Sequence, residues 1–284
     1  MTNLDLTVEH LSSGYGRNEI LHDLTFRISD PGIQVVIGKN GAGKTTLFRT
    51  LLGLLKLRAG TITYNGSDLL DSNTKLGYLG HSLAIPMGFS VKKALEFYAM
   101  LEGLDSSAVR DVATKLGLNA IIDAKFVTLS QGQKKRVSLA KCFLAERDVY
   151  IFDEPTTNLD PEMAAEIRGI IESLARDRII LYSSHNLYEA NELGTRVIAL
   201  DNGRISYDGR IDGIRRGKYL VGIKGTGFES VSPRPEKRGE YYVYEVSDAS
   251  RVGDLIQQLI NQNVRIFEVK ELSNPLETLY DNNQ

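Results

Sequence analysis

Residues 38–46 read Gly-Lys-Asn-Gly-Ala-Gly-Lys-Thr-Thr, a spacing suited to binding phosphate. Glycines at the turns let backbone N–H groups point inward at an anion, and the N-terminus of a following helix adds a partial positive charge. The pattern predicts that Lys44 neutralises nucleotide phosphates and that Thr45 gives a hydroxyl to Mg²⁺. An ordinary glycine-rich turn is the alternative. The nucleotide-binding residues predicted in this loop are Gly38, Asn40, Gly41, Ala42, Gly43, Lys44, Thr45 and Thr46.

A second segment ends in two carboxylates. The aliphatic run Val149–Phe152 is typical of a buried strand and is followed at once by Asp153 and Glu154. Beside a phosphate loop, Asp153 is predicted to hold the Mg²⁺ shell through water, and Glu154 to polarise the water that attacks the γ-phosphate. A strand followed by surface acids is common, so the pair predicts hydrolysis only together with the loop.

Between these two segments, residues 129–133 read Leu-Ser-Gln-Gly-Gln and open a predicted helix that continues to Leu144. Ser130 stands at the cap position, so its hydroxyl, the Gly132 amide and the helix N-terminus point the same way, an arrangement that suits an anion. A plain serine-capped helix with a cationic, solvated side is the alternative.

In this order, the three segments resemble the nucleotide-binding domains of ATP-binding-cassette (ABC) transporters, over about residues 4–208. The resemblance implies ATP and Mg²⁺ as cofactors, and Lys44, Glu154 and His185 as catalytic residues, with His185 bonding the γ-phosphate. It also implies that Tyr15 stacks on adenine, although a tyrosine in a turn explains that residue too. Finally, it implies a head-to-tail dimer in which Ser130, Gly132, Gln133 and Asp160 serve the nucleotide site shared with a second subunit.

One position departs from the family pattern. Where the family usually has a glutamine that contacts Mg²⁺ and the attacking water, this chain has His81, so His81 joins Thr45 and Asp153 as a predicted metal-site residue. A similar Leu-Gly-His is found in ATPases of the cytochrome-c haem exporters. A solvated loop histidine without a catalytic role is the alternative. We expect His81→Gln to keep or raise ATPase activity, and a loss comparable to that of a Lys44 substitution would contradict this.

The elements that carry these residues alternate between strand and helix, which predicts an α/β fold with a largely parallel sheet. The expected architecture is the P-loop NTPase cassette: a RecA-like core, an antiparallel β lobe and a helical subdomain inserted at about residues 82–145. Ser90, and either Ser106 or Ser107, are predicted to cap helices of that insert. The expected central strands are Ile33–Ile37, Val149–Phe152 and Ile179–Ser184, and the expected helices are Thr46–Leu55, Val91–Leu101 and Ala108–Leu116.

The chain is predicted to divide into a cassette at 1–212 and a small α+β accessory domain at 213–284. A cluster of glycines and charges at Gly203–Gly213 indicates a break between them. The elements expected after it are strands at Tyr219–Ile223, Tyr241–Val246 and Val264–Val269, a helix at about Arg251–Ile260 and a final short helix near Leu276–Tyr280.

Composition narrows the class of protein. The 284 residues carry a formal charge of −2, and this lack of basic excess argues against a nucleic-acid partner. A single cysteine, Cys142, fits a reducing compartment. No stretch approaches the ~20 apolar residues needed to span a bilayer. We therefore expect a cytoplasmic location, peripheral on the inner face of the membrane.

Together these features predict an ATP-hydrolysing subunit that powers transport by separate integral-membrane subunits, with a second nucleotide-binding subunit that is most simply another copy of this chain. Residues 274–280 resemble the tails of exporter subunits, which favours export. An importer subunit and a soluble, non-transport cassette ATPase remain as alternatives, but there is no second cassette and no heptad run. A non-hydrolysing cassette conflicts with the intact Lys44, Glu154 and His185.

Overall fold

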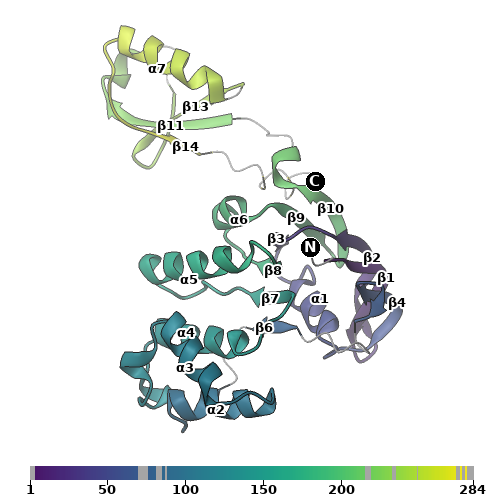
Figure 1. The fold of residues 1–284 in the computed structure, drawn as a ribbon. Helices are drawn as coiled ribbons and strands as arrows, with labels where there is room; N and C mark the ends of the chain where they lie inside the picture. The colour runs from purple at the N-terminus through teal and green to yellow at the C-terminus, as the bar shows by residue number, and fades with distance from the viewer. Residues whose placement is uncertain are drawn as a thin grey trace. The chain divides into compact units, whose positions relative to one another are not determined.

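The computed structural model describes residues 4–69, 76–80, 85–86, 88–214, 219–231, 235–247, 249–272, 276 and 279. The chain forms two compact units, residues 1–210 and residues 211–284. Among the described residues, the first unit contains two sheets and the second unit contains one (Figure 1).

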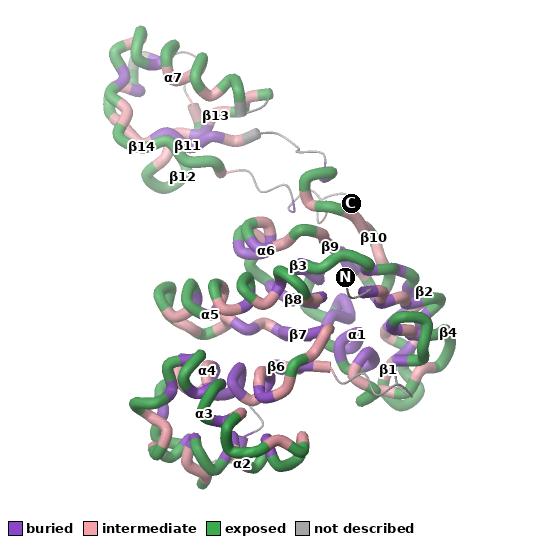
Figure 2. The backbone as a smooth tube through the Cα atoms, viewed as in Figure 1, coloured by how far each residue is buried: buried purple, intermediate pink, exposed green. Residues whose placement is uncertain are grey.

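The first unit is built on a six-stranded sheet, counted over the described residues, with the order β10-β9-β3-β8-β7-β6. All strands but β10 run parallel. Every residue of β3, β7 and β8 is buried, which is why these strands read as continuous aliphatic runs (Figure 2). The three predicted central strands are confirmed. The bounds are β3 Gly32–Ile37, β6 Gly77–Leu79, β7 Val149–Asp153, β8 Ile179–Ser183, β9 Arg196–Asp201 and β10 Arg204–Arg210.

The strand β10 corrects the sequence interpretation, in which the segment 203–213 was a break. Asn202 and Gly203 both have positive φ, 46° and 74°, and turn the chain tightly so that β10 pairs antiparallel with β9. Arg196 and Asp208 lie across this hairpin and form two hydrogen bonds of 2.7 Å each. The glycines and charges of this segment therefore belong to a hairpin at the sheet edge.

A second, antiparallel sheet forms the expected β lobe, with the order β2-β1-β4-β5. Its apolar side chains share one buried cluster with Phe48 and Leu51 of α1 and with Ile151 of β7. The helix α1 contacts β1, β2 and β7, so it joins the two sheets. The bounds are β1 Leu6–Tyr15, β2 Asn18–Ile28, α1 Lys44–Leu51, β4 Leu57–Tyr64 and β5 Ser67–Asp68.

Between β6 and β7, the described residues form three α-helices that gather at one end of this unit (Figure 1). They are α2 (Val91–Leu101), α3 (Ser106–Lys115) and α4 (Gln131–Phe143). Ser90 caps α2 as predicted, accepting from the Lys93 amide at 3.3 Å. The predicted serine cap of α3 is wrong. Asp105 caps it, because its carboxylate accepts from the Ser107 amide at 2.7 Å and Ser106 already belongs to the helix.

Two further helices, α5 (Pro161–Leu174) and α6 (Leu187–Leu193), lie on the opposite side of the core sheet from α1 (Figure 1). Asp160 caps α5 by accepting from the Met163 amide at 2.9 Å, and Pro161 occupies the first helical position. Asn186 caps α6. Both helices thus begin just after a sheet strand and its loop.

The second unit is a four-stranded antiparallel sheet, counted over the described residues, with one long helix. Val221, Ile223 and Phe228 pack with Leu259 and Val264 in its core. The predicted strands and helix are confirmed within a few residues, and β12 is an addition. The predicted short helix near 276–280 lies outside the described residues except for Leu276 and Leu279. The bounds are β11 Tyr219–Thr226, β12 Glu236–Arg238, β13 Tyr241–Val246, α7 Val252–Asn261 and β14 Arg265–Glu271.

The cysteine gives a first testable consequence of this packing. Cys142 on α4 is buried, its Sγ donates to the Tyr78 carbonyl at 2.9 Å, and burial raises its pKa to about 12. At pH 8 the thiolate is then rarer by about 1,000-fold than in an exposed cysteine. We expect almost no labelling by a maleimide in the native protein and one label per chain after denaturation, counted by mass spectrometry. Rapid native labelling would contradict this packing.

Candidate functional site

The phosphate loop is the turn between β3 and α1. Gly41 and Gly43 have φ of 85° and 111°, a left-handed region that side chains rarely adopt. A Cβ at Gly43 would lie 2.7 Å from Leu21 Cδ2, so this position has no space for a side chain either. The loop therefore needs glycine here, and its amides and the start of α1 surround one cavity.

Lys44, the first residue of α1, holds its cation inside this loop. Its Nζ donates to the Gly38 carbonyl at 2.7 Å and to the Lys39 carbonyl at 3.4 Å. Burial lowers the pKa of Lys44, although Glu154 and Asp153 act in the opposite direction. A buried ammonium that donates to neutral carbonyls can form a stronger hydrogen bond with an anionic phosphate.

Thr45 and Asp153 meet as the sequence predicted. Thr45 Oγ1 donates to Asp153 Oδ2 at 3.0 Å, and the other carboxylate oxygen accepts from Ser183 Oγ at 2.6 Å. Mg²⁺ in nucleotide sites takes oxygen ligands from one or two side chains, with phosphate and water completing the shell. The hydroxyl of Thr45 and the carboxylate of Asp153 fit that role.

Glu154 directly follows β7 and has a φ of 51°, which is unusual for a side chain of this size. Its Oε2 accepts from Thr157 Oγ1 at 3.2 Å and lies 3.5 Å from His185 Nδ1. His185 is exposed, with 59% of its side chain accessible. The structure thus brings two predicted catalytic residues together, and the third, Lys44, lines the same cavity as Glu154.

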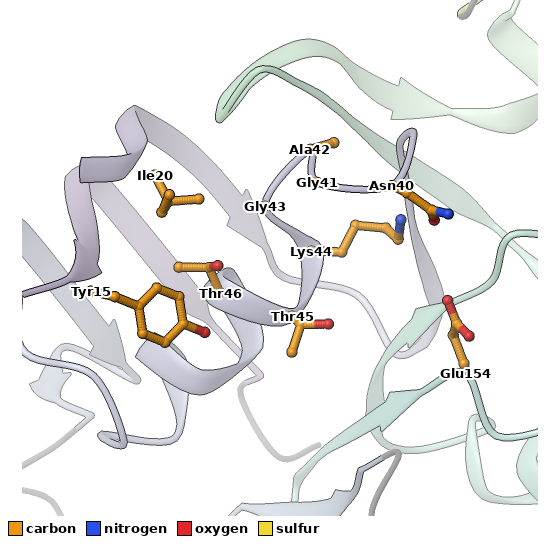
Figure 3. A pocket seen from close by; sticks show the side chains of 10 residues that line it. All are labelled: Tyr15, Ile20, Asn40, Gly41, Ala42, Gly43, Lys44, Thr45, Thr46 and Glu154. Carbon is orange, nitrogen blue, oxygen red and sulfur yellow. The ribbon is translucent and has the colours of Figure 1, made fainter. Parts of the chain in front are cut away.

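The cavity measures about 300 Å³ and is lined by the phosphate loop, Glu154, Tyr15 and Ile20 (Figure 3). Lys44 and Glu154 lie at one end, and Tyr15 and Ile20 at the other. The Tyr15 hydroxyl accepts from Arg49 Nη1 at 3.1 Å, and the residue is 41% exposed. An aromatic face at one end and cation and carboxylate at the other suit a base joined to phosphates. The sequence did not predict that Ile20 lines the cavity, because an apolar residue in a strand does not by itself indicate a binding site.

The Leu-Ser-Gln-Gly-Gln residues do not line this cavity. Ser130 Oγ accepts from the Gln133 amide at 3.2 Å, while the Gln133 side chain accepts from the Ser130 amide at 3.0 Å, so the two form a capping box at the start of α4. A Cβ on Gly132 would lie 2.8 Å from Met163 Cγ. Asp160 is also absent from the cavity lining. Within one chain, these predicted nucleotide-binding residues therefore do not line the cavity that the phosphate loop forms. The predicted metal-site residue His81 lies outside the described residues.

The chain is similar to proteins of one known family. A family model described as ABC transporter matches residues 21–157. The cytochrome c biogenesis ATP-binding export protein CcmA of Agrobacterium fabrum is 33% identical over 201 residues, covering 67% of this chain and 94% of that protein. The chain belongs to the ABC transporter ATP-binding family.

The other matches agree with this assignment. The uncharacterized ABC transporter ATP-binding protein YxlF of Bacillus subtilis is 25% identical over 289 residues, covering 97% of this chain and 98% of the relative. Among solved structures, the ATP-binding subunit of an ABC transporter matches with a TM-score of 0.67 and 30% identity, over 74% of this chain and 91% of its own. The chain is thus an ABC transporter ATP-binding subunit with the cassette fold, and the match to YxlF extends beyond the cassette into the second unit.

Proposed function

We propose that this ABC subunit hydrolyses ATP to power transport by separate integral-membrane subunits. The observation that carries the proposal is the cavity in which Lys44 and Glu154 face each other beside the Thr45–Asp153 pair. Binding alone would need the cation and the loop, whereas a carboxylate beside the same cavity supplies a group that can activate water.

Each side chain then has a defined role. Lys44 binds the β- and γ-phosphate oxygens and neutralises charge that develops during phosphoryl transfer. Thr45 and Asp153 would hold a Mg²⁺ ion, which offsets phosphate charge when bound. Glu154 orients the attacking water and accepts its proton, while His185, 3.5 Å from that carboxylate, bonds the γ-phosphate. Tyr15 stacks on adenine at the far end.

The site is proposed to be completed by a second nucleotide-binding subunit. Ser130, Gly132 and Gln133 begin a helix whose first amides suit an anion, yet they do not line the cavity of their own chain. A head-to-tail pair of copies places this helix start against the partner's γ-phosphate and Asp160 at the contact between them. ATP then joins the subunits, and hydrolysis releases them.

Membership of the family supports a proposal about membrane partners and location. No described helix is long and apolar enough to cross a membrane. We propose attachment to the cytoplasmic face through separate membrane subunits, without a nucleic-acid partner. Residues 213–284 are proposed as an accessory domain of this subunit.

Export is the proposed direction, because the tail at 274–280, of which the structure describes Leu276 and Leu279, resembles exporter tails in its sequence. The name of CcmA also specifies export, although proteins named for maltose import match this chain as well.

The proposal is tested by purification from membranes of the native host. A tagged chain should copurify with an integral-membrane protein and hydrolyse ATP in the presence of Mg²⁺. ATPase activity without any membrane partner would instead favour a soluble cassette ATPase, and absence of hydrolysis in the membrane complex would overturn the proposal.

A further inference from the structure

Glu154 owes its orientation to a backbone conformation that needs support. Its φ of 51° is sparsely populated by residues with a long side chain, and such conformations persist only where the surroundings fix them. Its carboxylate accepts a hydrogen bond from Thr157 and lies near the exposed His185. Hydrogen bonds to the backbone of Glu154 supply further support for this conformation.

The amide of Glu154 is held by Ser183 in the neighbouring strand β8. Glu154 N donates to Ser183 Oγ at 3.0 Å, and the same hydroxyl donates its hydrogen to Asp153 Oδ1 at 2.6 Å. Ser183 is completely buried, so water does not compete for either bond. One hydroxyl thereby connects the carboxylate that fits Mg²⁺ to the backbone of the residue that activates water.

The carbonyl of Glu154 is held from the other side by Lys135 of α4. Lys135 Nζ donates to this oxygen at 3.3 Å, and only 6% of the residue is exposed. Burial lowers the pKa of Lys135, while the nearby Asp153 and Glu154 carboxylates favour the charged form. A lysine is rarely buried without a specific partner, so its position here needs an explanation beyond packing.

We propose that Ser183 and Lys135 are positioning residues that clamp the backbone of Glu154 and thereby aim its carboxylate at the attacking water. The inference rests on the proposed hydrolytic role of Glu154. Because Lys135 lies five residues after Ser130 on α4, the clamp also connects the Leu-Ser-Gln-Gly-Gln helix to the hydrolytic carboxylate of the same chain.

The test for Ser183 uses two substitutions of equal size. Ser183→Val removes the hydroxyl, whereas Ser183→Thr keeps it, so any cost of the larger side chain is common to both. We expect kcat to fall by about 10- to 100-fold in Ser183→Val, the effect of a small misplacement of a catalytic group, with little change in ATP affinity. Ser183→Thr should recover most of this loss. Equal kcat values for the two variants would overturn the role of Ser183.

Lys135→Met keeps the aliphatic stem and removes the donor, and we expect about a 10-fold lower kcat at unchanged ATP affinity. Two neighbours on α4 serve as controls. Lys134→Met removes an adjacent cation, and Ser138→Ala removes a buried hydroxyl that donates to the Lys134 carbonyl at 3.0 Å. Both should keep wild-type kcat, and a fall equal to that of Lys135→Met would show a general effect on the helix and overturn the role of Lys135.

A second measurement does not depend on hydrolysis. Amide exchange at Glu154, followed by NMR, should be slow in wild type and Ser183→Thr and markedly faster in Ser183→Val, because the acceptor of this amide is lost. If wild type exchanges slowly but does not hydrolyse ATP, the proposed function fails while the clamp stands. If exchange is the same in Ser183→Val and Ser183→Thr, the clamp fails whatever the ATPase activity.

Discussion

Glu154→Gln is expected to slow ATP hydrolysis by about 100-fold or more while leaving ATP binding nearly unchanged, since general bases contribute at least this much. The amide retains the size of the carboxylate but cannot accept a proton. Glu154 lies at the phosphate end of the cavity, opposite Lys44, so the loss should affect kcat and not nucleotide affinity. Steady-state ATPase assays and equilibrium binding of ATP give the two quantities.

The same variant should reveal the second subunit. Without hydrolysis the ATP-bound pair persists, so Glu154→Gln with ATP and Mg²⁺ should elute as a dimer in gel filtration, whereas wild type should remain mostly monomeric. Glu172→Gln, which changes an exposed carboxylate on α5, is the matched control and should behave as wild type. Absence of an ATP-dependent dimer in Glu154→Gln would contradict the two-subunit site.

The parts of the fold that the sequence predicted well are those with local causes. Val149–Asp153 and Ile179–Ser183 are buried on both faces, so their composition alone identifies them as central strands. Ser90, Ser130 and Asp160 cap helices because a short polar side chain can reach an amide two or three residues ahead. Signals that act within one turn of chain can be read without knowing the fold.

What the sequence missed depends on contacts between distant segments. Ser183 and Lys135 reach Glu154 from positions 29 and 19 residues away in the chain. A serine at the end of an aliphatic strand was the available signal for the first. For the second, Lys135 shares a helical face with Leu139 and Cys142, both buried. Neither pattern identifies Glu154 as the contact, because the tertiary fold determines which distant residues meet.

The Ser130 segment shows a different limit. Its position at a helix start was predicted and is confirmed, with Ser130 and Gln133 in a capping box. Whether these residues also bind a nucleotide is a property of an assembly, since within one chain they lie away from the cavity. A sequence motif of this kind therefore predicts the local backbone structure better than it predicts which ligand binds there.

Lys44→Met is expected to weaken ATP binding by about 10- to 100-fold, because it removes a charge-assisted contact worth about 1.5–3 kcal/mol. The Lys44 side chain is buried, and its ammonium donates to the carbonyls of Gly38 and Lys39. Methionine occupies nearly the same stem volume, so the nucleotide-free protein should remain folded. The expected pattern is thus a large loss of ATP affinity by calorimetry, with a nearly unchanged melting midpoint in the absence of ATP.

The control is Lys39→Met, which removes an exposed cation from the same loop. If general electrostatic attraction between the loop and a polyphosphate governed affinity, Lys44→Met and Lys39→Met should weaken ATP binding by the same factor. In high salt, both variants should then bind ATP as tightly as wild type does. If the buried ammonium acts by direct contact, only Lys44→Met should lower affinity strongly, and ATP should no longer raise its melting midpoint. An unchanged ATP affinity in Lys44→Met would contradict this prediction and show that the loop binds phosphate by its amides alone.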